Sequence, residues 1–419
     1  MINAKKITDY AYVIHADITK SPLFEGIWPI PNGVTLNSYV VRGEKTAIID
    51  LYRDWEDAPE QMEEQIKSIG LSVNDIDFVI LNHLEPDHSD FLREFHRLNP
   101  KAQIISTAKG IALAEKFCKA GDGNYRAVKT GDTLDLGKGI VLSFVEIPNV
   151  HWPETMVTYD AKSGILFSCD AFGSYGKTED RIFDDEFSAE EHTFYEGESL
   201  RYYANIVASF SPFVKTAIQK LSDVPVKIVA PSHGIVWRKN PSEIIERYQK
   251  YAGYNTGGKL ENKICVIYGS MYGNTKLGVH SVLDGIKEKS EELKKSGISV
   301  PDITVLEIPQ TDVSVVLAEA YEAAGIVLAM PTYEYKMFPP MAYVLSLFSR
   351  KHFTGKKALR IGSWGWVGGA KKEYDEAVAP LRWEEIEPYE WQGLPSEEDF
   401  EVLKERGKLL VQSVVDMCN

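Results

Sequence analysis

The sequence predicts two domains of different fold class, an N-terminal α+β or layered α/β/β/α domain and a C-terminal doubly wound parallel α/β domain. Three observations predict this division. A chain of 419 residues is long enough for two or three domains. β-Branched runs bounded by Gly, Asn, Asp and Pro dominate the first 250 residues, whereas short strands and helices alternate after residue 262. The stretch 251–262, which separates these two regions, carries three glycines and two asparagines and is therefore the predicted linker. We accordingly expect one domain at 1–255 and another at 260–419.

The N-terminal domain is expected to consist mainly of strands, with helices between some of them. Two helical patterns interrupt the strands, 58–70, which ends on a C-cap glycine, and 110–121. An amphipathic helix at 241–250 closes the domain. Strands are predicted at 36–43, 45–51, 76–83, 102–107, 139–148 and 164–170.

The C-terminal domain shows the regular alternation that is typical of a parallel sheet covered by helices. A Gly-rich loop separates its first strand from its first helix. Strands are expected at 263–269, 303–308, 325–330 and 357–363, and helices at 276–297, 314–325 and about 338–351.

Composition excludes several classes of function. The chain has 46 Lys and Arg against 61 Asp and Glu, a net charge of −15, so we expect no nucleic-acid partner. Neither a signal peptide nor an apolar run of about 18 residues is found, so no membrane span is expected. The four cysteines, Cys118, Cys169, Cys265 and Cys418, form no CxxC pair, which favours a cytoplasmic location and excludes a cysteine-ligated rubredoxin or iron–sulfur module.

Potential metal ligands gather where predicted strands end. His83, Glu85, Asp87 and His88 lie within six residues after the strand DFVILN. Three more follow later strands, namely His151, Asp170 and His233. Each alone is as readily an ordinary polar loop residue, but seven in four strand-end loops favour a metal site. Four imidazoles with three carboxylates form an oxygen-rich set that suits redox iron better than zinc.

A second constellation predicts a phosphate site in the C-terminal domain. Ser270-Met271-Tyr272-Gly273-Asn274-Thr275 joins a strand to a helix, and hydroxyls with backbone N–H groups at a helix N-terminus bind anions. The loop has no Walker A lysine, which suits a phosphate monoester better than a triphosphate. Two later strand ends belong to the same edge of the sheet. They carry Pro331, Thr332 and Tyr333, and Ser363, Trp364, Gly365, Trp366 and Gly368.

The phosphate loop resembles the flavodoxin [ST]-x-[ST/Y]-G-N-T loop, which implies FMN. Trp364 or Trp366 is then expected to stack on its isoalloxazine ring. The alternative is that both are buried tryptophans in a Gly-rich turn.

The ligand pattern H-x-[EH]-x-D-H … H … D … H resembles that of the metallo-β-lactamase fold. With Glu85 in the third place and a later flavin module, the chain resembles the flavodiiron proteins (A-type flavoproteins) over essentially its entire length. The resemblance implies an αββα sandwich followed by a flavodoxin-like sheet. It also implies two irons, one on His83, Glu85 and His151, the other on Asp87, His88 and His233, with Asp170 as the bridge. Whether His88 binds is open. Tyr195 is expected to donate a hydrogen bond near the ligands or to be a structural tyrosine.

The resemblance implies an oxidoreductase in which FMN passes electrons to the di-iron centre, which reduces O2 to water and/or NO to N2O. It also implies a head-to-tail homodimer or a dimer of dimers. The electron donor is expected to be a separate molecule: rubredoxin, a reduced deazaflavin or a flavin reductase. Two alternatives stay open at this point, a metal-dependent hydrolase with an accessory flavodoxin domain and an electron carrier in which only the flavodoxin half works.

Overall fold

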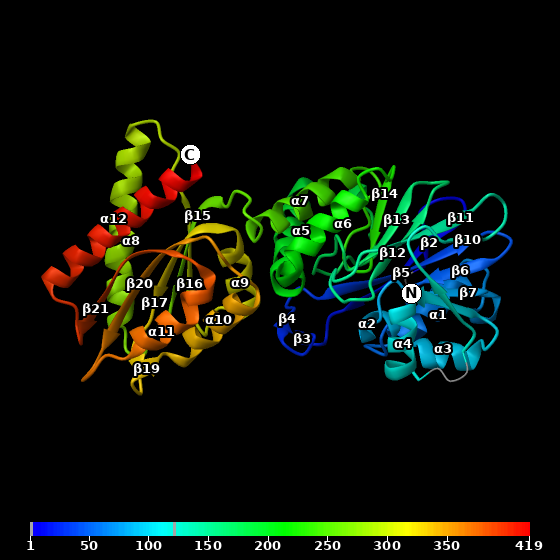
Figure 1. The fold of residues 1–419 in the computed structure, drawn as a ribbon, viewed down its shortest axis with the longest axis horizontal. Coiled ribbons are helices and arrows are strands. Elements are labelled where there is room, and N and C mark those ends of the chain that lie inside the picture. Colours follow the sequence, from blue (N-terminus) through cyan, green and yellow to red (C-terminus); the bar gives the residue numbers. More distant parts are fainter. Residues whose placement is uncertain (1–2, 120–122) are drawn as a thin grey trace. The chain divides into compact units, whose positions relative to one another are not determined.

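The computed structural model describes residues 3–119 and 123–419, which form two compact units, Met1–Gln249 (unit 1) and Lys250–Asn419 (unit 2). Unit 1 has two large sheets and unit 2 has one, and each unit has its own helices (Figure 1). The helix expected at 110–121 ends at Phe117, and residues 120–121 of that prediction lie outside the described residues. No helix in the described part of the chain is both long enough and apolar enough to cross a membrane.

Unit 1 is built on two sheets that pack face to face. Apolar side chains from both sheets, such as Tyr39, Ile80, Phe144 and Phe167, form one buried cluster between them. The seven-stranded sheet has the order β1 (Lys5–Lys6), β2 (Ala11–Ile18), β5 (Val34–Arg42), β6 (Thr46–Ile49), β7 (Phe78–Ile80), β8 (Gln103–Thr107) and β9 (Tyr125–Val128). The five-stranded sheet has the order β10 (Thr133–Asp135), β11 (Val141–Glu146), β12 (Met156–Asp160), β13 (Ile165–Cys169) and β14 (Ile228–Pro231).

Helices cover this sandwich. Helices α1 and α4 pack on β2 and on β8 and β9, so they lie on the seven-stranded sheet. Residues of α6 and α7 border one surface cavity together with Leu166 of β13, so they lie beside the five-stranded sheet. The helices are α1 (Ala58–Ser68), α2 (Pro86–Ser89), α3 (Leu92–Leu98), α4 (Ala108–Phe117), α5 (Ala189–Tyr202), α6 (Ser211–Lys220) and α7 (Pro241–Tyr254), with a π-helical segment at Tyr203–Val207 and a small hairpin of β3 (Leu23–Phe24) and β4 (Trp28–Pro29).

The residues 251–254, predicted as linker, belong to a helix. Helix α7 continues to Tyr254 because Tyr251, Ala252 and Tyr254 are buried and so extend its apolar side. The glycines at 257 and 258 follow only after it ends. The helix predicted at 241–250 therefore ended one turn too early.

Unit 2 is a five-stranded parallel sheet in the order β16-β15-β17-β20-β21. This is the flavodoxin strand order, with the first strand next to both the second and the third. Helices α8 and α12 pack on one face, and α9 with α10 lies on the other (Figure 1). The elements are β15 (Glu261–Tyr268), α8 (Asn274–Lys295), β16 (Asp302–Glu307), α9 (Val313–Glu322), β17 (Ala323–Ala329), β18 (Thr332–Tyr333), β19 (Lys336–Met337), α10 (Pro339–Arg350), β20 (Lys357–Trp364), α11 (Ala370–Val378), β21 (Glu384–Gln392) and α12 (Glu397–Cys418).

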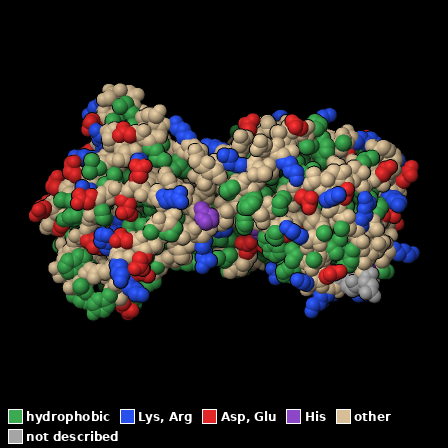
Figure 2. Space-filling model, in the orientation of Figure 1, with side chains coloured by type: hydrophobic (Ala, Val, Ile, Leu, Met, Phe, Trp, Pro, Cys, Tyr) green, Lys and Arg blue, Asp and Glu red, His purple; other side chains and the backbone are tan. Residues whose placement is uncertain are grey.

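Acidic and basic side chains are intermixed on the face of the molecule that Figure 2 shows. Among the described residues, no region of that face carries basic side chains alone.

Helices α8 and α12 approach each other closely at two glycines. A Cβ at Gly285 of α8 would lie 1.9 Å from the carbonyl oxygen of Lys404, and one at Gly407 of α12 would lie 2.3 Å from that of Val282. Both neighbours are backbone atoms of the opposite helix, which cannot move alone. The packing of this helix pair therefore requires glycine at both positions.

Replacement of Gly407 by alanine should destabilise unit 2. Alanine favours a helix over glycine by roughly 1 kcal/mol, but overpacking against the Val282 carbonyl should cost about 1–3 kcal/mol. Urea unfolding of Gly407→Ala measures the balance, and Gly197→Ala in α5 is the matched control, because a Cβ there meets nothing within 4 Å. The control should be neutral or stabilised. Equal stability changes in both variants would contradict close helix packing at Gly407.

Candidate metal centre and flavin site

The seven predicted metal ligands converge at one edge of the sandwich in unit 1. Each follows a strand or opens the short helix after it. His83 follows β7, and Glu85 precedes α2, which carries Asp87 and His88. The other three lie after strands of the second sheet: His151 after β11, Asp170 after β13 and His233 after β14. Six are buried and Glu85 is half-buried, so the ends of both sheets contribute to one interior cluster.

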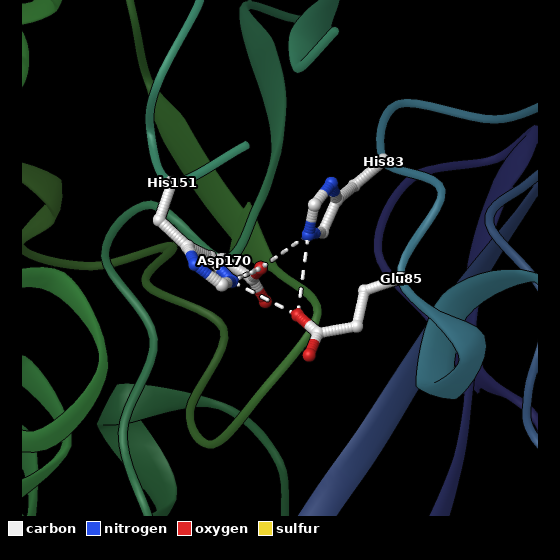
Figure 3. A group of neighbouring side chains, drawn as sticks. All are labelled: His83, Glu85, His151 and Asp170. Atoms are coloured by element: carbon white, nitrogen blue, oxygen red, sulfur yellow. Dashed lines mark hydrogen bonds and ion pairs between the residues drawn. The ribbon is translucent and has the colours of Figure 1, made fainter. Parts of the chain in front are cut away.

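The first group consists of His83, Glu85, His151 and Asp170, whose ligand atoms lie within 4.8 Å of one another (Figure 3). The Nε2 atoms of both histidines point at the same two oxygens. His151 Nε2 lies 2.9 Å from Glu85 Oε2, and His83 Nε2 lies 3.3 Å from it. Both Nε2 atoms lie 3.3 Å from Asp170 Oδ2. Four donor atoms thus surround a single point.

The second group consists of Asp87, His88 and His233, and it meets the other oxygen of Asp170. His88 Nε2 lies 2.9 Å and His233 Nε2 3.3 Å from Asp170 Oδ1. The same two nitrogens lie 3.4 and 3.3 Å from Asp87 Oδ2. Asp170 therefore directs one oxygen to each group, as a carboxylate that bridges two ions does. His88 directs its Nε2 into the group just as His233 does.

These donors fit two cations. The Oδ atoms of Asp87 and Asp170 and the Nε2 atoms of His88 and His233 are buried, and within the described residues none makes a hydrogen bond. Buried polar atoms of this kind are normally satisfied, and convergent carboxylates and imidazoles are satisfied by metal ions. Both groups are mixed N/O sets without thiolate, which suits iron.

Opposite charges stabilise the cluster without metal. Burial alone would lower the pKa of His83, but its hydrogen bonds to Glu154 and Glu85 outweigh burial and raise that pKa to about 10. The pKa of His233 rises to about 10 through Asp170 and Asp87, again against burial. Burial would raise the pKa of Asp170, yet the surrounding histidines hold it well below the usual value.

The sequence did not predict the groups that orient the histidine ligands by binding their Nδ1 atoms, on the side away from the cluster. Glu154 Oε1 accepts from His83 Nδ1 at 2.8 Å and from the backbone N–H of Leu84 at 3.0 Å. When the His83 ring is neutral, this contact keeps the proton on Nδ1 and leaves Nε2 directed at the cluster as a ligand for a metal ion. His233 Nδ1 lies 3.1 Å from the backbone oxygen of Thr35 and is held in the same way. The only sequence feature that pointed to Glu154 was its position three residues after the predicted ligand His151.

Tyr195 and Tyr202 both belong to α5, but only Tyr202 packs against a ligand. The Tyr195 hydroxyl donates to the backbone oxygen of Lys177 at 2.5 Å. The ring of Tyr202 instead lies 5.7 Å, centroid to centroid, from that of His233. A role for Tyr195 beside the ligands stays a prediction, and Tyr202 is the tyrosine of this helix that the sequence reading overlooked.

A surface cavity of about 430 Å³ reaches the cluster from outside. Its lining includes Glu85 and Asp87 together with Phe24, Arg53 and Trp55. A small molecule can therefore reach both ligand groups from this side, past aromatic and cationic side chains.

Unit 2 holds a separate cavity of about 390 Å³ at the carboxyl ends of its strands. It lies at the strand ends where a doubly wound sheet binds its ligand. Twelve of the predicted flavin residues line it, together with Glu334 and Gly393, which the sequence reading did not single out. The predicted residues at the lining are Ser270, Met271, Tyr272, Asn274, Thr275, Pro331, Thr332, Tyr333, Ser363, Trp364, Gly365 and Trp366.

The loop before α8 has the geometry of a phosphate cradle. Gly273 takes a left-handed backbone (φ 94°) at the helix N-cap, and its N–H donates to Ser270 Oγ at 3.0 Å. Thr275 and Ser363 pair their hydroxyls at 2.8 Å in the same cavity. Trp366 is 75% exposed and Tyr272 92% exposed, and both line it. Flat aromatic side chains and an anion cradle together fit a phosphorylated flavin.

Known proteins combine the same two parts. Residues 34–234 match the family described as ODP family beta lactamase. The chain is 34% identical over 345 residues to the anaerobic nitric oxide reductase flavorubredoxin of Vibrio vulnificus, covering 82% of this chain and 66% of that protein. It is 32% identical over 378 residues to the protein of that name from Escherichia coli, covering 90% of this chain and 75% of the relative. The chain thus spans about two thirds to three quarters of these relatives.

A solved structure agrees over the whole chain. A single-residue variant of the flavo di-iron protein from Thermotoga maritima has 27% identity and a TM-score of 0.86, with 99% of each chain covered. Fold and site define an oxidoreductase in which a metallo-β-lactamase-like domain is joined to a flavodoxin-like parallel sheet. The chain belongs to the flavodiiron protein family.

Metal binding to the metal-free protein should release protons. The pKa values of His88 and His151 are raised to about 9, and those of His83 and His233 to about 10, so all four are protonated at pH 7. Metals bind neutral imidazole, so binding should expel protons and strengthen as the pH rises from 7 toward 9. Anaerobic calorimetry with Fe²⁺ in buffers of different ionisation enthalpy counts the protons. Binding at pH 7 without proton release would contradict this charge assignment.

Proposed function

We propose that the chain is a flavodiiron reductase that takes electrons through FMN and reduces NO to N2O and/or O2 to water. The placement of Asp170 carries this proposal, because its two oxygens face two different pairs of histidine nitrogens, 2.9–3.3 Å away. A carboxylate so placed suits a pair of ions. The flavodiiron membership of the chain supports the same assignment.

His83, Glu85 and His151 would hold one iron, and Asp87, His88 and His233 the other, with Asp170 shared. His88 is included because its Nε2 lies as close to Asp170 as that of any other histidine. Bound iron would supply the electron-transfer chemistry. Glu154 and the Thr35 carbonyl would hold the rings of His83 and His233 in place through their Nδ1 atoms. The cavity beside Glu85 would be the route by which a diatomic substrate enters.

FMN is the proposed cofactor of unit 2. Its phosphate would lie at the N-terminus of α8, with Ser270, Asn274 and Thr275, and its ring between the segments that carry Tyr333 and Trp364 or Trp366. Gly273 and Gly368 would permit the backbone to follow the cofactor closely. The division into domains 1–255 and 260–419 belongs to the same proposal.

The hydrolase alternative is not favoured. Glu85 adds an anionic oxygen where zinc hydrolases of this fold usually carry histidine, and anionic oxygens stabilise ferric iron. A flavin-type cavity in the same chain also has no part in hydrolysis. Stopped-flow mixing of the reduced, iron-loaded protein with O2 and, separately, with NO tests the reductase and measures its preference. A protein that holds only zinc and is reoxidised by neither gas would contradict it.

The finer features of the proposal concern location, donor and assembly. Four buried free thiols, Cys118, Cys169, Cys265 and Cys418, support a reducing, cytoplasmic location. Electrons would arrive from a separate donor, either rubredoxin, a reduced deazaflavin or a flavin reductase. The assembly would be a head-to-tail homodimer or a dimer of dimers, in which one chain's flavin serves the other chain's irons.

Asp170→Ala should abolish NO and O2 reduction and leave FMN bound. Without the shared anion, two bound cations would repel each other with no Asp170 carboxylate between them. The flavin cavity belongs to unit 2, so the absorbance of bound FMN should persist. Metal analysis, flavin absorbance and gas consumption are measured together. Near-normal turnover by the variant would show that Asp170 is not the bridge.

Electron transfer between chains can be tested by mixing two inactive variants. Asp170→Ala keeps a working flavin, and a double substitution of Gly273 and Asn274 in the cradle keeps a working di-iron site. If the flavin of one chain serves its partner, mixed dimers should recover part of the wild-type rate. Differently tagged chains confirm that heterodimers form. Confirmed heterodimers without activity would rule out transfer between chains.

A further inference from the structure

A cavity of about 500 Å³ in unit 1 has no part in the proposed reductase. Residues of α6 and α7 border it, together with Leu166 of β13. None of the predicted metal ligands is among the residues that line it. Small-molecule sites in proteins have volumes of roughly 300–1,000 Å³ and mainly apolar walls, with a few polar groups that orient the ligand. This cavity has the size of such a site.

Apolar side chains form most of the wall of this cavity. Leu166, Phe172 and Leu221 are buried in the fold. The other apolar side chains of the wall are half-buried and come from α6, from the segment after it and from the start of α7: Ile218, Val224, Val226, Pro241 and Ile245. Part of their surface is therefore in contact with water inside a concave space. An apolar ligand group would cover that surface, which is favourable because apolar area leaves water.

Three polar side chains of the wall lie together where α7 begins. Lys239 and Asn240 directly precede the helix, and Ser242 is its second residue. Among the described residues that line the cavity, Lys239 is the only charged one. Its backbone N–H donates to Asp184, but its ammonium has no hydrogen bond or ion pair within residues 3–119 and 123–419. The wall thus combines apolar surface with one unpaired positive charge.

The start of α7 adds to this positive potential. A helix N-terminus carries the positive end of the helix dipole, and α7 is 14 residues long. The acidic residue in its first turn, Glu243, is paired with Arg247 at 2.6 Å and accepts from the Asn240 amide at 3.0 Å. The charge of Glu243 is therefore offset within α7, which leaves the Lys239 ammonium available to an anion.

A single ammonium suits an anion of one charge. A carboxylate carries one negative charge at neutral pH, whereas a phosphate monoester carries up to two and is held by several donors. The cradle proposed for phosphate in unit 2 offers such a donor set, with the hydroxyls of Ser270 and Thr275 at the start of α8. The cavity in unit 1 instead offers one cation and a large apolar wall. It therefore favours a carboxylate on an apolar chain.

The cavity is separate from the metal ligands but borders the segment that carries Asp170. Leu166 belongs to β13, which leads to Asp170, and Phe172 follows Asp170 by two residues. The ring of Phe172 packs on that of Tyr248 at 5.1 Å, centroid to centroid. The Tyr248 hydroxyl in turn donates to the Gly173 carbonyl at 2.7 Å. A ligand in the cavity would contact this segment without binding a metal ion.

We propose that this cavity binds a small carboxylic acid with an apolar chain, of which a medium-chain fatty acid is the simplest example. The carboxylate of the acid would lie at Lys239 and the start of α7. Its chain would lie against Ile218 of α6, Val226 and Ile245 of α7. The site needs neither iron nor flavin, so it goes beyond the proposed reductase and does not depend on it.

Calorimetric titration of the full chain with octanoate tests the site. Octanol has the chain without the charge, and butyrate has the charge with a shorter chain, so each should bind at least about fivefold more weakly than octanoate. Lys239→Gln should also weaken octanoate binding about fivefold, which is the effect of losing one partly exposed ion pair. Lys215→Gln should leave octanoate binding unchanged, because this exposed lysine of α6 does not line the cavity.

A second pair of variants locates the binding. Ile245→Trp places an indole ring in the cavity and should remove octanoate binding, whereas Thr216→Trp, at an exposed position of α6 outside the lining, should retain it. Thermal unfolding checks that both variants fold. The proposal would be overturned by a wild type that does not bind octanoate, by equal binding of the three probes, or by binding that survives Ile245→Trp. Gas consumption measures the proposed reductase separately, so either can fail without the other.

Discussion

The carboxylate of Asp170 lies between four imidazoles, and the arrangement of unit 1 depends on holding it there. It is 1% exposed, and each of its oxygens faces a different pair of histidines. An isolated buried carboxylate would be costly, so the imidazoles and the ions they bind are required to offset its burial. The chain turns sharply just before it, because Cys169 has a left-handed backbone with φ 53°. The Cys169 carbonyl then accepts from Ser232 N at 2.8 Å, next to His233.

Both sheets of unit 1 position ligands around the Asp170 carboxylate. β7 delivers His83 from the first sheet, and β13 and β14 deliver Asp170 and His233 from the second, so the packing between the sheets fixes the distances between ligands. Protein interiors are close-packed and transmit small shifts, so a change in the packing between the sheets should alter these distances. In unit 2 the sheet also positions the site, because its parallel strands bring the phosphate loop and the aromatic segments to one edge.

The sequence predicts the parts of the site that depend on local spacing. The cluster His83 to His88 and the loop Ser270 to Thr275 each lie within six residues, and strand ends place them at sheet edges. Groups supplied from a distance were not predictable in this way. Glu154 reaches His83 only because two strands from different sheets meet, and Tyr202 reaches His233 only because α5 has fourteen residues and ends there. Such contacts depend on tertiary packing, which carries no periodic signal.

Anomalous X-ray diffraction at the iron absorption edge tests the central claim most directly. Crystals of protein produced with sufficient iron should show two anomalous peaks per chain, one on each side of the Asp170 carboxylate. His83, Glu85 and His151 should surround one peak, and Asp87, His88 and His233 the other. A single peak, or peaks that appear only at the zinc edge, would contradict the account of Asp170 as an anion shared by two irons.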